Sequence, residues 1–193
     1  MATLPPIQRT LRCGTPLTIR SAAREDSAAI LDFRRRTCAT TDQVLTQAHE
    51  CPATAEEQWE SMRSTIERPD AMFLVGLIAG EVVCLVSFAA GVRERARHAG
   101  VMGITTALEW RGRGVGTAAL RVLIDWCAAH PTIEKVGLVV FSSNPDAYRL
   151  YERLGFVEEG RQFGQTQIRP GEYVDDIHMA RWVKPRRSAG GPA

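Results

Sequence analysis

Short apolar runs alternate with amphipathic segments along most of this chain. A short run rich in Val, Ile and Leu is typical of a strand. Such runs predict strands at residues 17–20, 72–78, 81–88, 98–108, 136–141, 156–159 and 173–182. Ala79 and Gly80 separate two of these runs and predict a hairpin, and Pro170 and Gly171 mark a loop before the last run.

Between the predicted strands, apolar residues recur at helical spacing. This spacing predicts helices at residues 24–36, 54–68, 117–129 and 145–154. Thr54 and Glu57 form a capping box at the start of one helix. Ser143 or Asn144 can cap the last helix, and Gly155 is placed to end it.

Strands that alternate with helices, with hairpins at both ends, predict a mixed α/β sheet. The 193 residues suffice for one domain with a sizeable core. We therefore expect an irregular N-terminal arm at residues 1–16, a single domain at 17–183 and a flexible tail at 184–193. Residues 37–53 are polar and poorly periodic, which predicts a long loop or a loop with a short helix.

Residues 111–117 read RGRGVGT, follow a predicted strand and open a predicted helix. Glycines let the backbone approach a ligand closely and adopt positive φ. The first amides of a helix lack partners within the helix, and the helix dipole favours an anion there. Arg111 and Arg113 add positive charge that suits a pyrophosphate. The segment therefore predicts a phosphate-binding loop.

The spacing of residues within this loop distinguishes the protein families that bind phosphate with a glycine-rich loop. A Walker A loop requires a lysine before Ser or Thr, and residues 111–117 contain no lysine. The glycines match the dinucleotide fingerprint G-x-G-x-x-G poorly, and the loop lies past the middle of the chain. Arg111, Gly114 and Gly116 instead resemble the R/Q-x-x-G-x-G/A motif of the GNAT acetyltransferase superfamily. Taken alone, the motif is also compatible with an ordinary glycine turn before a core helix.

A second motif supports the same resemblance. Residues 144–156 read NPDAYRLYERLGF and are similar to the downstream GNAT segment N-x-x-A-x-x-L-Y-x-x-L-G-F. Either motif can arise by chance, but both in this order and at this separation are typical of the family. The resemblance covers roughly residues 17–182. It identifies the chain as a member of the GNAT superfamily.

The resemblance implies an α/β fold with a mixed, mostly antiparallel sheet of about six or seven strands, flanked by helices. The central strands at 98–108 and 136–141 would splay apart into a V. The pantetheine arm of acetyl-CoA would enter the V and pair with the first of these strands. Ile104, Thr105 and Thr106 are the backbone contacts that the resemblance implies.

The resemblance also implies the other cofactor contacts. The residues expected around the pyrophosphate are Arg111, Gly112, Arg113, Gly114, Val115, Gly116 and Thr117. Asn144 would hydrogen-bond the pantetheine, with Ala147, Tyr148 and Tyr151 beside it.

Acetyl-CoA is therefore the predicted co-substrate, and the resemblance implies direct attack by an amine in a ternary complex, with no covalent enzyme intermediate. Tyr151 is the candidate general acid. A phenol with a pKa of about 10 is a workable proton donor for a thiolate of pKa about 8.5. The other reading of Tyr151 is a buried core aromatic with a satisfied hydroxyl.

The sequence does not identify the general base. The predicted strand at 98–108 contains no carboxylate, and similar bacterial sequences tend to carry Glu at the position of Val101. The candidates that stay open are a water chain, His98, Asp175, Asp176 and His178.

The lack of a strong base favours a weakly basic acceptor. Deprotonating a lysine-type amine at pH 7 costs about 4.6 kcal/mol, against about 1 kcal/mol for an α-amine of pKa about 7.7. This difference favours an α-amino group as the acceptor. The predicted acceptor is a primary amine of a small molecule, an amino acid or a peptide N-terminus. Antibiotic or herbicide-type amines remain alternatives within the class.

Residues 171–181 read GEYVDDIHMAR and resemble the ending of bacterial GNATs near the amino-acid and ribosomal-protein N-terminal acetyltransferases. Two interpretations of the acidic pair Asp175 and Asp176 stay open. The pair attracts a substrate amine, or it is the polar end of an exposed strand. Residues 37–53 should form part of the acceptor wall, because this segment joins the first two helices in the family. His49 and Glu50 are its most reactive-looking members.

The composition of the chain limits the classes of ligand and macromolecule that it is expected to bind. A net charge of +2 gives no footprint for nucleic acid or an anionic membrane surface, and no apolar run approaches the length of a membrane span. The four histidines lack metal-ligand spacing, so we predict no metal. The scattered cysteines, read as free thiols of a cytoplasmic protein, are Cys13, Cys38, Cys51, Cys84 and Cys127.

Two readings compete with the enzyme. The chain could be a catalytically silent acyl-CoA sensor, or the glycine loop could bind a nucleotide. A homodimer through the closing strands and tail is a further expectation, because many GNATs form one.

Overall fold

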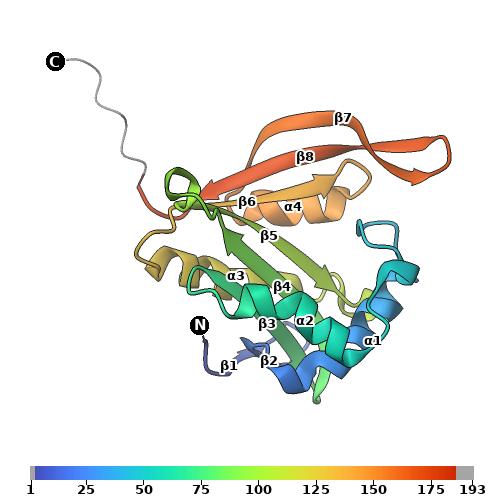
Figure 1. Cartoon of the computed structure of the whole chain (residues 1–193), viewed down its shortest axis with the longest axis vertical. Coiled ribbons are helices and arrows are strands. Elements are labelled where there is room, and N and C mark those ends of the chain that lie inside the picture. The colour runs from blue at the N-terminus through green and yellow to red at the C-terminus, as the bar shows by residue number, and fades with distance from the viewer. Residues whose placement is uncertain (1–2, 186–193) are drawn as a thin grey trace.

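An eight-stranded sheet runs through the molecule in the order β1-β2-β3-β4-β5-β6-β8-β7 (Figure 1). The computed structural model describes residues 3–185. The strands are β1 (Ile7–Thr10), β2 (Pro16–Ser21), β3 (Ala71–Ile78), β4 (Glu81–Ala90), β5 (Ala99–Thr106), β6 (Lys135–Phe141), β7 (Val157–Arg169) and β8 (Glu172–Trp182). The helices are α1 (Ser27–Cys38), α2 (Ala55–Ile66), α3 (Val115–Ala129) and α4 (Pro145–Arg153).

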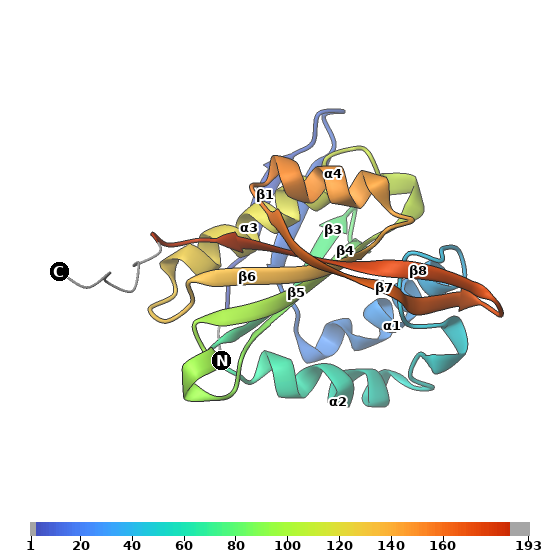
Figure 2. The ribbon, with the colours of Figure 1, turned by 90° about the horizontal axis from the view of Figure 1, so that it is seen from above.

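The helices form a layer on each face of the sheet. Helices α1 and α2 cover one face, and α3 and α4 cover the other (Figure 2). Each helix turns an apolar side to the sheet, as the buried Ile30 and Phe33 of α1 and Leu123 of α3 show. Phe88 of β4 packs edge-on against Trp126 of α3, with ring centroids 6.0 Å apart. The core therefore lies in two layers, one on each side of the central strands.

Strands β5 and β6 pair only over a short length. They run parallel, and their pairing extends from Ala99 with Lys135 to Val101 with Gly137. Beyond Val101, β5 stays paired with β4 up to Thr106 but has no strand partner on its β6 side within the described residues. The predicted α/β fold and the predicted V between these two strands are both confirmed.

Two predicted boundaries were wrong. The arm at residues 1–16 was expected to be irregular, but it contains β1, which pairs antiparallel with β2. The strand expected at 156–159 is β7, which extends to Arg169 where a loop was predicted. Both strands have mostly exposed side chains, so they lack the apolar face that marks a strand in sequence. Because β1 joins the seven predicted strands, the sheet has eight strands rather than six or seven.

The division into arm, domain and tail stays a prediction. Of the tail, the structure describes only Lys184 and Pro185, and Lys184 Nζ donates a hydrogen bond to the Pro131 carbonyl at 3.2 Å. The rest of the predicted tail lies outside the described residues.

Candidate active site

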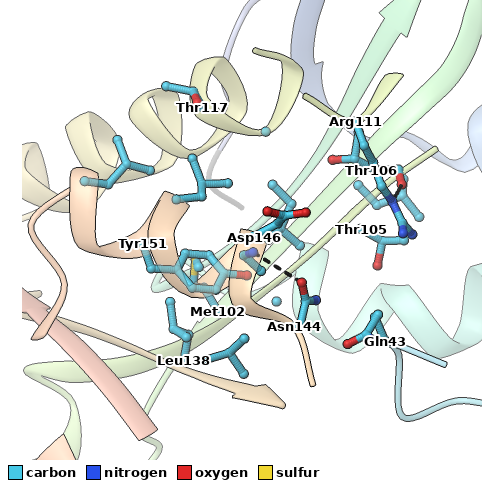
Figure 3. A pocket seen from close by; sticks show the side chains of 18 of the residues that line it. Gln43, Met102, Thr105, Thr106, Arg111, Thr117, Leu138, Asn144, Asp146 and Tyr151 are labelled. Carbon is cyan, nitrogen blue, oxygen red and sulfur yellow. Dashed lines mark hydrogen bonds between the residues drawn. The ribbon is translucent and has the colours of Figure 1, made fainter. Parts of the chain in front are cut away.

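A cleft of about 1750 Å³ opens where β5 and β6 separate. Its walls come from these strands and from β3, β4 and β8, from the β1–β2 hairpin, from the glycine loop with α3 and α4, and from α1 with the segment after it. The predicted site residues that line it are Ile104, Thr105, Thr106, Arg111, Gly112, Gly114, Gly116, Thr117, Asn144, Ala147 and Tyr151. Those that Figure 3 labels converge from three places: Thr105 and Thr106 from β5, Arg111 and Thr117 from the glycine loop and the start of α3, and Asn144 and Tyr151 from α4 and its cap.

The glycine loop has the backbone that an anion site requires. Gly112 and Gly114 have φ of +71° and +93°, a left-handed conformation that side chains other than glycine rarely adopt. Gly114 is the N-cap of α3, and the first helical hydrogen bond runs from Ala118 N to its carbonyl, at 3.0 Å. The amides of residues 115–117 therefore lack partners within the helix, and they sit at its positive end. This backbone fits a pyrophosphate.

Three predicted cofactor residues lie outside the cleft wall. The Arg113 guanidinium stacks over the Trp110 ring, 5.2 Å from its centroid. Val115 is fully buried in the core. The Tyr148 hydroxyl donates to Glu158 Oε2 at 3.2 Å, toward β7. Arg111 does line the cleft, and its Nε donates to the Thr106 carbonyl at 3.2 Å.

Tyr151 lies deep in the cleft. Its ring packs edge-on against Phe156, with centroids 6.0 Å apart, and points into the cleft near Met102 and Leu138 (Figure 3). Burial raises the pKa of the Tyr151 phenol to about 12. Repulsion from the Cys84 thiolate is a second, smaller cause of the raised Tyr151 pKa. Burial raises the pKa of Cys84 itself to about 12. Tyr151 is therefore an uncharged hydrogen-bond donor at physiological pH.

Asn144 caps α4 and faces the cleft. Its side-chain oxygen accepts a hydrogen bond from Ala147 N at 3.2 Å, drawn as the dashed line in Figure 3. Pro145 follows at the first helical position, where its missing N–H costs nothing. The cap uses the oxygen of Asn144, so the side-chain amide N–H groups are left to donate to a ligand.

Among the candidate bases, the structure brings only Asp176 into the cleft wall. Its Oδ1 accepts from Thr166 Oγ1 at 2.8 Å. Asp175 instead accepts from Gly164 N at 3.0 Å and lies 3.6 Å from an Arg161 nitrogen. The two histidine candidates, His98 and His178, also lie outside the cleft wall. His98 stacks on Trp182, with centroids 6.4 Å apart.

His178 is the second histidine candidate, and it lies on β8 opposite Val139 of β6. Its Nε2 atom is buried and finds no hydrogen-bond partner among the described residues. The imidazole does not line the cleft.

One end of the cleft lies against α1. The acceptor wall was predicted there, so we call this end the acceptor half. Thr37, Cys38 and residues 43–46 line it, as expected for part of the 37–53 segment. His49 and Glu50 do not, because they belong to a short 3₁₀ turn in which Glu50 accepts from Gln47 N at 2.7 Å.

The segment after α1 is tied across the cleft at two points. Asp42 forms an ion pair with Arg169 at the end of β7. Ser143 Oγ, just before α4, donates to Gln43 Oε1 at 3.3 Å. Sequence reasoning missed both ties, because each joins residues at least 100 positions apart.

Sequence reasoning also missed Arg34, which lines the acceptor half. The available signal was its helical spacing from Thr37 and Cys38, which places all three on one face of α1.

The comparisons with known proteins agree with this geometry. A model of the acetyltransferase (GNAT) family matches residues 39–156. The L-amino acid N-acetyltransferase AaaT of Escherichia coli (strain K12) is 30% identical over 165 residues, which cover 86% of this chain and 97% of that protein. The chain belongs to the GNAT acetyltransferase family.

Solved GNAT structures share the fold of this GNAT protein. A GNAT-family acetyltransferase from Streptococcus pneumoniae superposes with a TM-score of 0.82 at 26% identity, covering 87% of this chain and 99% of its own. A phosphinothricin acetyltransferase (Pat) from Sinorhizobium meliloti, in complex with acetyl-CoA, gives 0.75 at 23% identity, covering 92% and 93%. The second likeness supports the fold alone.

The described residues 3–185 contain no group of three or more His, Cys, Asp or Glu side chains arranged to hold a metal ion. Within the same residues, no helix combines the length and the apolar character needed to cross a membrane. All five cysteines of this GNAT protein are unpaired.

Proposed function

We propose that this protein transfers the acetyl group of acetyl-CoA directly to the α-amino group of a small molecule. One observation carries the proposal: the open edge of β5 runs from the glycine loop to Tyr151 inside a single cleft. The family membership supports acetyl-CoA as the donor. The relative named as an L-amino acid N-acetyltransferase supports an α-amine as the acceptor.

Different residues of the cleft would bind different parts of acetyl-CoA. The amides of residues 115–117 and the Arg111 guanidinium would hold the pyrophosphate. The backbone of residues 103–106 would pair with the amides of pantetheine, as an edge strand pairs with an added strand. Acetyl-CoA supplies the thioester carbon and the thiolate that leaves it. Tyr151 would donate its hydroxyl hydrogen to that sulfur as the carbon–sulfur bond breaks.

Asp176 would take up the proton that the attacking amine loses, directly or through water. It is the candidate base in the cleft wall, and its tie to Thr166 holds the carboxylate in place. The nitrogen lone pair then forms the new bond to the acetyl carbon. The electrons of the broken carbon–sulfur bond stay on sulfur, which takes the Tyr151 proton. The proton held by Asp176 then returns through water to the Tyr151 phenolate. The products are the amide and CoA with both side chains in their starting states, and no oxidant, reductant or metal is required.

The experiment is mass-spectrometric detection of acetylated product from acetyl-CoA and pooled amino acids, short peptides, polyamines and aminoglycosides. Acetylation of amino acids or peptide N-termini above the no-enzyme background is the expected result. Acetylation of polyamines alone would contradict the α-amine acceptor. No product, with acetyl-CoA still bound, would favour the acyl-CoA sensor, and competition by ATP or NAD would favour the nucleotide reading.

Two further expectations accompany the proposal. The five free thiols favour the reducing environment of the cytoplasm. The exposed Val157 and Phe163 of β7 favour a homodimer through the closing strands.

A further inference from the structure

We propose that Arg34 binds the carboxylate of the acceptor, so that the enzyme selects free α-amino acids over amines that lack a carboxylate. The inference rests on the proposed acetyl transfer and adds the residue that selects the substrate. It starts from the position of Arg34 on α1, in the acceptor half of the cleft and half-buried.

The Arg34 guanidinium is poorly satisfied within the protein. Among the described residues its one hydrogen bond is long, at 3.4 Å from Nη1 to Gln58 Oε1. Gln58 is fully buried and uncharged, and its own amide donates to Ser61 Oγ at 3.1 Å. A guanidinium carries five N–H donors, so most of those of Arg34 have no protein acceptor among the described residues. A half-buried cation with spare donors favours an anionic ligand.

Neighbouring arginines show what a satisfied guanidinium looks like in this region. Arg20 binds Asp26 with two hydrogen bonds, of 2.6 and 2.7 Å. Arg24 binds Glu56 at 2.8 Å. Arg35, next to Arg34, donates to the carbonyls of residues 52 and 53 at 2.7 and 2.9 Å. Arg34 differs from all three because its charge faces the cleft without such a partner.

The acceptor half of the cleft suits the rest of an amino acid. Asp176 lies in the cleft wall on β8, so the cleft offers an anion for the ammonium as well as a cation for the carboxylate. Phe73 and Leu85 on β3 and β4 and Val139 on β6 supply an apolar surface for the side chain. A zwitterion with an apolar side chain matches this combination of charges and surface.

The other arginines in the cleft wall come from other elements than α1. They come from the β1–β2 hairpin, the glycine loop, α3 and α4, and they are Arg9, Arg12, Arg111, Arg121, Arg149 and Arg153. Arg111 lies in the loop expected to bind phosphate, and the Arg113 charge acts on Cys13 of the hairpin, which places that hairpin beside the loop. Arg111 and the arginines of the adjacent hairpin therefore suit the phosphates of the cofactor, and Arg34 on α1 suits the acceptor.

The wild-type protein tests the selectivity first. Leucine, leucinamide and 3-methylbutylamine share one side chain and differ in the carboxylate. We expect kcat/KM for leucine to exceed that for each of the other two by about 10- to 100-fold, the range for one hydrogen bond to a charged group. Equal or better turnover of 3-methylbutylamine or leucinamide would overturn the inference.

The Arg34→Gln variant then tests whether the preference for a carboxylate comes from Arg34. We expect KM for leucine to rise by about 10- to 100-fold, while turnover of 3-methylbutylamine and the affinity for acetyl-CoA stay unchanged. Arg35→Gln is the matched control, since Arg35 binds backbone carbonyls outside the cleft wall. An equal loss on leucine and the amine, or a loss of acetyl-CoA affinity, would assign Arg34 to structure or to the cofactor.

Calorimetric binding of leucine to the protein with CoA separates the inference from the proposed function. If the wild type acetylates none of the three compounds, the α-amine transferase proposal fails. The role of Arg34 then stands if leucine binds the wild type and loses at least about tenfold in affinity in Arg34→Gln. It falls if leucine binds both proteins equally or binds neither.

Discussion

Burial changes the chemistry of the tyrosine that the motif selects. A phenol in water has a pKa of about 10, and burial raises that of Tyr151 to about 12. A raised phenol pKa means that the protonated form persists up to the folded-state value and is lost only above it. Tyr151 should therefore remain a hydrogen-bond donor to the leaving sulfur across the working pH range, although it is a weaker acid than an exposed tyrosine.

Replacing Tyr151 by Phe removes the donor and keeps the ring that packs on Phe156. We expect kcat to fall by about 100-fold or more, as for loss of a general acid, with acetyl-CoA affinity nearly unchanged. The wild-type rate should show no loss from tyrosine ionisation below about pH 11, measured by steady-state kinetics across pH. Tyr173→Phe is the control, because Tyr173 is exposed on the β7–β8 hairpin. Undiminished turnover in Tyr151→Phe would remove Tyr151 from the mechanism.

The cysteines should differ sharply in reactivity. Hydrogen bonds to Thr15 lower the pKa of the exposed Cys13 thiol. Burial raises the pKa of Cys84 and of Cys127 to about 12. Since the thiolate is the reactive form, iodoacetamide at pH 8 should label Cys13 first and leave the other two unmodified in the native state. Peptide mapping by mass spectrometry reads the order, and early labelling of Cys84 would mean that the core around it opens.

At the scale of elements, the start of α3 depends on one left-handed glycine. Gly114→Ala would force a side chain into φ +93° and should cost about 1–2 kcal/mol. The strain displaces the amides of residues 115–117, so acetyl-CoA affinity should fall as well. Calorimetry and thermal unfolding measure the two effects.

Gly116→Ala is the matched control for this element. A Cβ at position 116 would first meet Leu150 Cδ2 at 3.4 Å and Ile104 Cδ1 at 3.6 Å, which is ordinary contact. The GNAT motif also admits alanine at this point. Stability and acetyl-CoA affinity should therefore stay close to wild type. A Gly114→Ala variant that behaves like Gly116→Ala would show that the left-handed turn is not required.

The elements that the sequence predicts well are those with an apolar face. Helix α1 and strands β3 and β4 carry such a face, and each was found close to its predicted bounds. Strand β7 has no such face: its register with β8 shifts at three places, and its side chains are largely exposed. Backbone pairing with β8 holds this strand, and a single strand's sequence does not encode its partner.

The same division applies to the cleft. The glycine loop and the Asn144 cap are local structures, so contiguous motifs predicted them. The acceptor half is assembled from α1, the segment after it and β8, and the contact between Asp42 and Arg169 spans 127 positions. Only the folded chain shows which polar residues of residues 37–53 face the cleft and that His49 does not.

At the scale of the whole molecule, the β7–β8 hairpin supports the acceptor half from outside. Arg169→Gln removes its ion pair with Asp42 and leaves the Gln43 contact to Ser143. Exposed ion pairs contribute about 0–1 kcal/mol to stability, so the unfolding temperature should barely change. The segment after α1 should become more mobile, and KM for the acceptor should rise about twofold to tenfold while KM for acetyl-CoA stays constant.

Arg63→Gln is the control for that variant. Arg63 on α2 also forms exposed ion pairs, with Glu60 and Glu67, but it does not line the cleft. Steady-state kinetics with both substrates separates the two arginines. Equal effects of both variants, or a change confined to acetyl-CoA, would mean that the hairpin does not support the acceptor site.

The parting of β5 from β6 has a consequence for the life of the protein in a cell. Beyond Val101, the edge of β5 has no strand partner in the part of the chain that the structure describes. Such an edge resembles the exposed edges through which sheets of different molecules join. A ligand that pairs with this edge acts as a removable strand, and its binding energy adds to folding stability as its concentration exceeds its Kd. The abundance of intact protein should therefore follow the supply of CoA, so that a starved cell loses the enzyme together with its donor.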